Sequence, residues 1–280
     1  MEFLRQLFRR RPPVDLCVVI RSSPDWGKLS QEEFEEQSRV FCRRVNRPEE
    51  QVVETARLWD ATFRTTYCQT RQAMKEIAQE TLRRMAPAEI VQGEPAELRP
   101  GALYLLTDDD DWFSPELPKA LARVPSVDYD GVTWGNVMLG PWRKGVPEPI
   151  LSEPEPIQMR PLTVTCHSNN YALAASYLLR TKKAWKKVFS HGHADEVFRT
   201  LNIFNIPQYL SVKNTNPAST VFLENGLRQE FTSRRLRELI DQYNARFQTG
   251  EPFGPPDLRW AQGSIEAVRR FFVELAAGAR

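Results

Sequence analysis

Short apolar runs and longer amphipathic stretches alternate along the first half of the chain. The run VDLCVVI at 14–20 is β-branched and nearly continuous, which is typical of a strand covered on both faces. A second run, ALYLL at 102–106, follows Pro100-Gly101 and is too short for three helical turns, so it predicts another buried strand. Between them, residues 30–45 and 48–85 carry apolar positions at helical spacing. The pattern predicts an α/β protein with extra helices after its first strand.

The helix predicted over 30–45 begins at a capping box, in which Ser30 is followed by Glu33. The next helical stretch carries an apolar stripe that we interpret as core: Val52, Val53, Ala56, Trp59, Phe63, Tyr67, Met74 and Ile77. It also carries five arginines that we interpret mainly as a solvated face: Arg57, Arg64, Arg71, Arg83 and Arg84. A phosphate-binding or acceptor-binding role for one of them is the alternative.

Shorter patterns complete the prediction. Further strands are expected at 90–91, 129–139, 162–166 and 209–212, the third leading into His167. Further helices are expected at 115–124, 172–180, 233–247 and 264–277. Residues 141–161 contain six prolines and predict an extended loop, of the kind that often forms a lid or an acceptor-binding flap.

Composition narrows the classes of protein. The chain has 280 residues, and its 38 basic and 36 acidic side chains give a net charge of +2, which argues against a nucleic-acid partner. No run approaches the roughly 18 apolar residues of a transmembrane helix. The basic start, residues 1–13, lacks a signal peptide's apolar core, so we expect a frayed lead-in, with peripheral membrane contact as the alternative. Four cysteines without a CxxC pair predict reduced thiols in the cytoplasm.

Four consecutive carboxylates, Asp108 to Asp111, follow the strand at 102–106 directly. Adjacent acids repel one another by up to about 1 kcal/mol per close pair in water, so such crowding indicates either a solvated turn or a bound cation. Ligands of α/β proteins bind at the carboxyl ends of strands, which favours the second interpretation. Hard ions such as Mg²⁺ or Mn²⁺ prefer oxygen ligands and are commonly shared with phosphates.

Other polar residues follow the predicted strands. Arg21 ends the first strand, where it could meet a phosphate or simply face solvent. Asn169 and Asn170 lie in a polar corner that could cap a helix or aim amides at a sugar hydroxyl. His191 and His193 flank a glycine and could complete a metal site built by carboxylates, or else cap a helix.

Several catalytic motifs are absent from the sequence. It contains no HExxH, GxSxG or P-loop motif, and no GxGxxG follows a predicted strand. These absences argue against zinc proteases, serine hydrolases, P-loop kinases and ordinary dinucleotide oxidoreductases.

The acidic stretch resembles the GT-A glycosyltransferases. It ends a strand with the pattern D-x-D-D, here Asp108, Asp110 and Asp111, continues with two aromatic residues and reaches Pro115 seven positions after the first acid. The closest likeness is to the bacterial rhamnosyltransferase-like group, in which an early strand ending in arginine, here VVIRSS, precedes helices and an acidic loop. The region before the acids is more helical than that pattern, and no ED or QxxRW motif follows them.

This resemblance implies a fold and its extent. The expected fold class is α/β, with a GT-A-like (Rossmann-like), mixed and mainly parallel sheet flanked by helices. It would occupy residues 14–225 as a nucleotide-sugar-binding catalytic domain. Residues 1–13 would form the basic lead-in, and residues 226–280 would form a C-terminal helical extension.

The resemblance also implies roles for individual residues. Asp110, with Asp108 or Asp111, would hold Mn²⁺ or Mg²⁺ against the diphosphate of a nucleotide-sugar donor, and His191 or His193 would join the metal. Asp109 would contact ribose or sugar hydroxyls, and Asn169 or Asn170 would position the sugar or the acceptor. The catalytic base would be Asp195 or Glu196.

We therefore expect a metal-dependent glycosyltransferase that moves a sugar to an acceptor hydroxyl. The sequence does not indicate whether the acceptor is a saccharide, a lipid-linked sugar or a protein. Two alternatives remain: a metal-dependent phosphohydrolase or nucleotidyltransferase, and a non-enzymatic helical interaction protein. Stabilisation by a nucleotide diphosphate in the presence of the metal would distinguish a transferase from both.

Overall fold

A computed structural model describes much of the chain. The described residues are 14–21, 29–45, 50, 61–85, 88–93, 95–124, 129–139, 169–181, 201–214, 216, 218 and 256–277. The strands are β1 (Leu16–Arg21), β2 (Glu89–Gln92), β3 (Leu103–Asp108), β4 (Trp112–Phe113), β5 (Gly131–Leu139), β6 (Tyr171–Ala174) and β7 (Ile203–Asn214). The helices are α2 (Gln31–Val45), α4 (Ala61–Arg83), α5 (Leu117–Ala122), α6 (Ala175–Arg180) and α11 (Gln262–Ala276), with a 3₁₀ helix, η1, at Pro256–Ala261.

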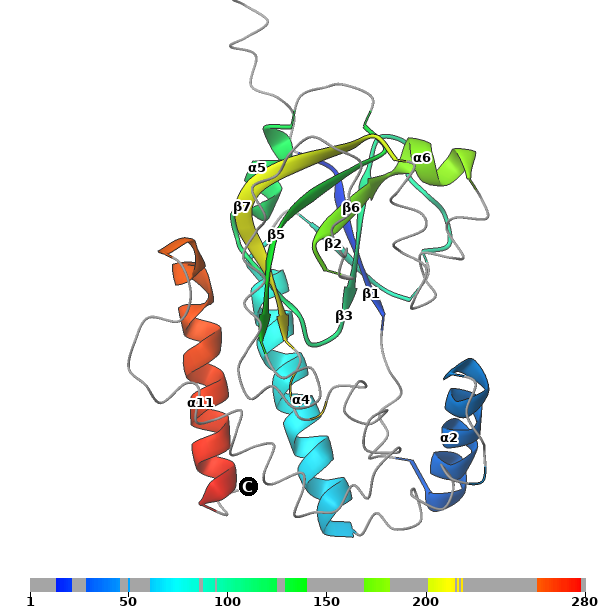
Figure 1. Cartoon of the computed structure of the whole chain (residues 1–280), viewed down its shortest axis with the longest axis vertical. Coiled ribbons are helices and arrows are strands. Elements are labelled where there is room, and N and C mark those ends of the chain that lie inside the picture. Colours follow the sequence, from blue (N-terminus) through cyan, green and yellow to red (C-terminus); the bar gives the residue numbers. More distant parts are fainter. Residues whose placement is uncertain are drawn as a thin grey trace, which may run out of the picture.

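The seven strands form one curled mixed sheet in the order β2-β1-β3-β6-β5-β7-β4 (Figure 1). β1 pairs in parallel with β2 and β3, and β5 pairs in parallel with β7. β6 is antiparallel to both β3 and β5, and β4 is antiparallel to β7. Five strands therefore run in one direction and two in the other, which confirms the prediction of an α/β fold with a mixed sheet. The sheet was expected to be mainly parallel, but three of its six pairings are parallel and three are antiparallel.

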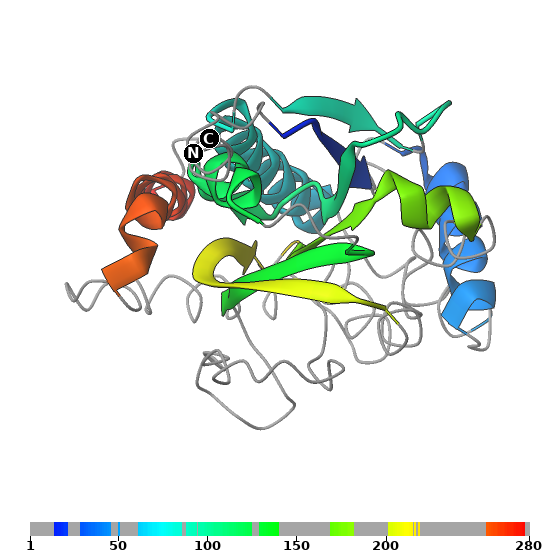
Figure 2. The same ribbon diagram turned by 90° about the horizontal axis from the view of Figure 1, so that it is seen from above.

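Helices cover both faces of this sheet. On one face, α5 and the end of α4 pack on apolar side chains of β1, β3 and β5. On the other face, α6 packs on β1, β3 and β6. Seen from above, the sheet curls around α4 and α5, and α11 lies beside α4 (Figure 2). The C-terminal helix thus shares a core with the central part of the chain.

Several elements agree with the sequence pattern for local reasons. The capping box is present: the Glu33 N–H donates to Ser30 Oγ at 3.2 Å, and the Ser30 N–H donates to Glu33 Oε2 at 2.8 Å. Tyr67 and Met74 of the predicted stripe are buried. Gly101 has a φ of +82°, a conformation that favours glycine and turns the chain into β3.

Three parts of the sheet differ from the prediction. Residues 172–174, predicted as the start of a helix, belong to β6 instead, because buried pairing with strands on both sides outweighs a short helical pattern. β7 begins at Ile203 rather than at 209, and its pairing with β5 is irregular around Pro207, which cannot donate to a ladder. The short strand β4 was not predicted. Residues 162–166 and 233–247 lie outside the described residues.

Among the helices that the structure describes, none has both the length and the apolar character needed to cross a membrane.

Candidate functional site

The acidic loop lies at the carboxyl edge of the sheet, next to the end of β1. Arg21, the last residue of β1, pairs in register with Asp108, the last residue of β3, and its Nη2 donates to Asp108 Oδ1 at 3.0 Å. The chain leaves β1 towards β2 and leaves β3 towards the opposite half of the sheet. This is a topological switch point, where open α/β sheets bind their ligands.

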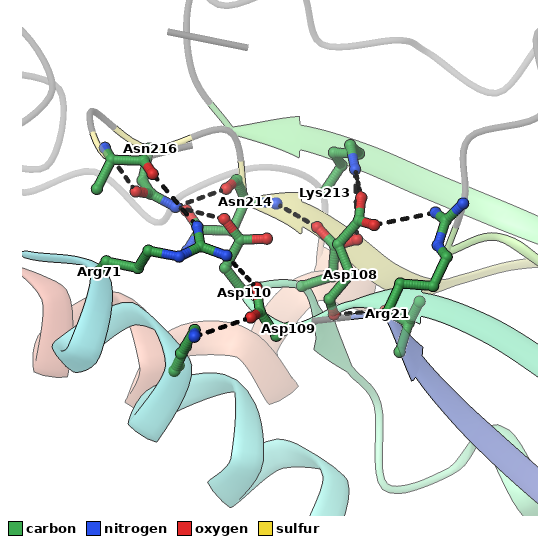
Figure 3. A network of polar contacts seen from close by, with 12 residues as sticks. Arg21, Arg71, Asp108, Asp109, Asp110, Lys213, Asn214 and Asn216 are labelled. Atoms are coloured by element: carbon green, nitrogen blue, oxygen red, sulfur yellow. Dashed lines mark hydrogen bonds and ion pairs between the residues drawn. The ribbon is translucent and has the colours of Figure 1, made fainter. Parts of the chain in front are cut away.

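A lysine of β7 holds Asp108 from the other side (Figure 3). Lys213 Nζ donates to Asp108 Oδ2 at 2.6 Å and lies 3.5 Å from Asp111 Oδ2. Next to it, the Asn214 N–H donates to Asp111 Oδ1 at 3.0 Å. Burial opposes the charge on Lys213, but Asp108 and Asp111 raise its pKa overall, so the ammonium stays charged.

Asp109 points towards α4 instead. Arg71 Nη2 donates to Asp109 Oδ1 at 2.8 Å, and Lys75 Nζ lies 3.1 Å from Asp109 Oδ2. The interpretation of the arginines as a solvated face is confirmed for Arg83 and Arg84 but wrong for Arg71, whose side chain is 3% exposed. Arg71 lies in the helix one turn from Lys75, so the two cations reach the same carboxylate.

The last two acids are the most deeply buried of the four. Asp110 Oδ2 accepts a hydrogen bond from Asn216 Nδ2 at 2.9 Å, and Asn216 Oδ1 in turn accepts one from the Ala218 N–H. Burial raises the pKa of Asp110, and burial raises the pKa of Asp111 to about 8. Both carboxyls are therefore more easily protonated than ordinary aspartates.

Buried polar groups without a protein partner lie along the same edge. Both side-chain polar atoms of Asn169 lack a hydrogen-bond partner, although the residue is 0% exposed, and Arg21 Nε and Thr133 Oγ1 also lack one. β6 is antiparallel to β3, with Ala172 paired to Leu105, so Asn169, which precedes β6, lies at the edge of the sheet where β3 ends. Unpaired buried amides are costly in a finished core, so these groups indicate a place for a ligand or for water.

The carboxylates supply the oxygen chemistry that Mn²⁺ or Mg²⁺ prefers, but their arrangement does not fit such an ion. Within the described ranges, no three His, Cys, Asp or Glu side chains come together as a metal would require. Asp108 is held between Arg21 and Lys213, and Asp111 is held by Lys213 and Asn214. A divalent ion at these oxygens would have to displace the ammonium of Lys213.

The sequence-predicted residues divide into two groups, and the site also contains residues that were not predicted. The structure brings Arg21 together with Asp108 and the following acids, and it places Asn169 and Asn170 at the same edge of the sheet. His191, His193, Asp195 and Glu196 lie outside the described residues, so their roles stay predictions. Sequence reasoning missed Arg71, Lys75, Lys213, Asn214 and Asn216. A lysine and two asparagines directly after an apolar strand were the available signal for the last three.

Comparison with known proteins adds no further constraint: no protein-family model matches the sequence, and no curated protein matches it at a significant level.

Proposed function

We propose that this chain is a glycosyltransferase with a GT-A-like fold, which moves a sugar from a nucleotide-diphosphate sugar to an acceptor hydroxyl. The resemblance of the acidic stretch to that family suggests the reaction. Asp108 and Arg21, paired at the switch point of the sheet, support the placement of the donor there.

The single observation that carries the proposal is the edge formed by β1, β3 and β6. It combines a cation at the end of β1, acids at the end of β3 and a buried Asn169 amide that has no protein partner. A diphosphate needs cationic donors, and a sugar or ribose needs neutral groups that both donate and accept. An edge built only for stability would leave fewer buried polar atoms unpaired.

The described residues suggest a division of labour. Arg21 would donate from its guanidinium to phosphate oxygens, because Asp108 accepts from one terminal nitrogen and Nε has no partner. Asn169 would bind a hydroxyl of the sugar or ribose. Asp109 is held by Arg71 and Lys75, so its geometry favours anchoring the acidic loop to α4 over contacting a sugar. The resemblance implies Mn²⁺ or Mg²⁺, but the described carboxylates do not fit such an ion, and no step here depends on it.

The test is a binding and turnover series with nucleotide sugars that differ in base and sugar. Thermal shift should show stabilisation by at least one nucleotide sugar and by its nucleoside diphosphate, since a ligand of the folded state raises its stability. Arg21→Met should weaken that binding roughly tenfold or more, the cost of a lost charge-assisted hydrogen bond. Arg83→Met is the matched control, because Arg83 lies on the exposed face of α4.

The alternatives predict different results. A phosphohydrolase or nucleotidyltransferase would split a phosphate bond, so it would release phosphate or pyrophosphate and not transfer the sugar. A non-enzymatic interaction protein would show no stabilisation by any nucleotide. Transfer of the sugar to a hydroxyl acceptor would support the proposal. Chromatography that separates the donor from the product measures this transfer.

A further inference from the structure

We propose that Lys213 takes the place of a divalent ion in this site, so that its ammonium and Arg21 bind the donor diphosphate without a metal. The inference rests on the proposed function only in taking a diphosphate as the ligand. It concerns a residue that the sequence pattern did not assign to the site.

The position of the ammonium is the first argument. Lys213 Nζ lies 2.6 Å from Asp108 Oδ2 (Figure 3). It also lies 3.5 Å from Asp111 Oδ2. A cation that bridges two carboxylates in this way does what a divalent ion would do for the same oxygens. The Lys213 side chain is 19% exposed, so part of it faces solvent.

The balance of charge is the second argument. Among the described residues, four cations surround the loop: Arg21 and Lys213 pair with Asp108, and Arg71 and Lys75 pair with Asp109. Burial raises the pKa of Asp110 and Asp111, so their carboxyls add little negative charge to attract a further cation. A divalent ion that displaced Lys213 would remove the contacts of its ammonium with Asp108 and Asp111 in a largely buried place, which costs free energy. Two further positive charges added beside Lys213 would be repelled by it at close range.

The third argument does not depend on the ion pairs. It is that buried hydrogen-bond donors without a partner lie near Arg21 and Lys213. Arg21 Nε has no hydrogen-bond partner. Asn136 Oδ1 accepts a hydrogen bond from the backbone N–H of Lys213 at 3.1 Å, while Asn136 Nδ2 is buried and has no partner. Asn169, which precedes β6 at the edge where β3 ends, has both amide atoms unpartnered. Buried donors without acceptors beside two cations fit an anionic, oxygen-rich ligand such as a diphosphate.

Inorganic pyrophosphate is the probe, because it carries the diphosphate without a base or a sugar. Calorimetry with the full chain should detect pyrophosphate binding in the presence of EDTA. The affinity for pyrophosphate should not increase when Mn²⁺ replaces EDTA. Lys213→Met should weaken binding in EDTA at least about tenfold, the loss expected for one charge-assisted contact. Lys213→Arg should keep part of it. Lys119→Met is the matched control, because Lys119 pairs with Glu116 on the exposed side of α5.

Mn²⁺ binding, followed by electron paramagnetic resonance of the free ion, gives a second readout. The wild-type chain should bind Mn²⁺ weakly, and Lys213→Met should bind it more tightly because two carboxylate oxygens are released. The wild-type comparison of EDTA with Mn²⁺ decides the question even if that variant fails to fold.

Three results would overturn the inference. They are pyrophosphate binding by the wild type only with Mn²⁺, no pyrophosphate binding under either condition, and unchanged binding by a folded Lys213→Met variant. Metal-free pyrophosphate binding without transfer from any nucleotide sugar would instead overturn the proposed function and leave the role of Lys213 supported.

Discussion

Arg71 of α4 and Asp109 of the acidic loop form a buried ion pair, with Arg71 Nη2 2.8 Å from Asp109 Oδ1. Arg71 Nη1 also donates to the carbonyl of Ala218 at 3.3 Å, beyond the end of β7. Burial opposes the charge on Arg71, but Tyr67 and Asp109 raise its pKa overall, so the guanidinium stays charged. One arginine therefore connects α4, the acidic loop and the segment after β7.

Replacing Arg71 with methionine should destabilise the fold by about 3–5 kcal/mol, because the buried Asp109 carboxylate loses its closest partner. Urea denaturation followed by circular dichroism measures the change in the free energy of unfolding. Arg83→Met, on the exposed face of the same helix, should change it by less than about 0.5 kcal/mol. Adding Asp109→Asn to Arg71→Met should recover part of the loss. A loss below about 1 kcal/mol in Arg71→Met would mean that the pair is not a structural link.

The Asp111→Asn variant tests the effect of burying Asp111 through the pH dependence of the free energy of unfolding. Burial raises the pKa of Asp111 to about 8, whereas an unfolded chain releases this proton at about pH 3.9. Between these values the folded state binds the proton and the unfolded state does not, so the contribution of Asp111 to stability falls as pH rises from about 4 to 8.

The asparagine variant has no proton to lose in this range. Its free energy of unfolding, relative to the wild type, should therefore be higher at about pH 8 than at about pH 5. Urea melts of both chains at the two pH values measure this difference. The Asn214 N–H can still donate to the asparagine side-chain oxygen, which limits the structural change. The same pH dependence in both chains would contradict the assignment.

The fold and the site differ in how far the sequence could predict them. The capping box and β3 depend on neighbouring residues, so their local patterns were sufficient. β6 is four residues long and forms through pairing with β3 and β5, which no local pattern reports. The partners of the acids are separated from them by 38 residues for Arg71 and 105 for Lys213. Nothing in the spacing of the lysine and arginine residues indicated which of them would turn inward.

Cys17 is a free thiol, but it should resist alkylation. It lies in β1, where it is buried, and burial is the main cause that raises its pKa to about 11. At pH 8 the thiolate, which is the reactive form, is therefore scarce as well as inaccessible. Iodoacetamide labelling of the folded protein, read by peptide mass spectrometry, should modify Cys68 before Cys17, because Cys68 is partly exposed. In denaturant, Cys17 and Cys68 should be labelled equally, which is the reference. Equal labelling of the two cysteines in the folded protein would contradict the prediction.

Gly135→Ala should destabilise the irregular pairing of β5 and β7. A Cβ at Gly135 would lie 2.9 Å from the carbonyl oxygen of Gln208 and 3.2 Å from Cδ1 of Tyr209, so backbone would have to move. The register of the two strands shifts at this glycine, next to Pro207, which leaves little room to adjust. Overpacking of this kind costs about 1–3 kcal/mol, measurable as a lower urea midpoint.

Gly263→Ala gives the matched comparison, because a Cβ there meets no atom within 4 Å and the residue lies in α11. Alanine favours a helix over glycine by up to about 1 kcal/mol, so this variant should be as stable as the wild type or more stable. The two substitutions add the same methyl group, and only the space around it differs. If Gly135→Ala were as stable as Gly263→Ala, the close approach of β7 to β5 at Gly135 would be wrong.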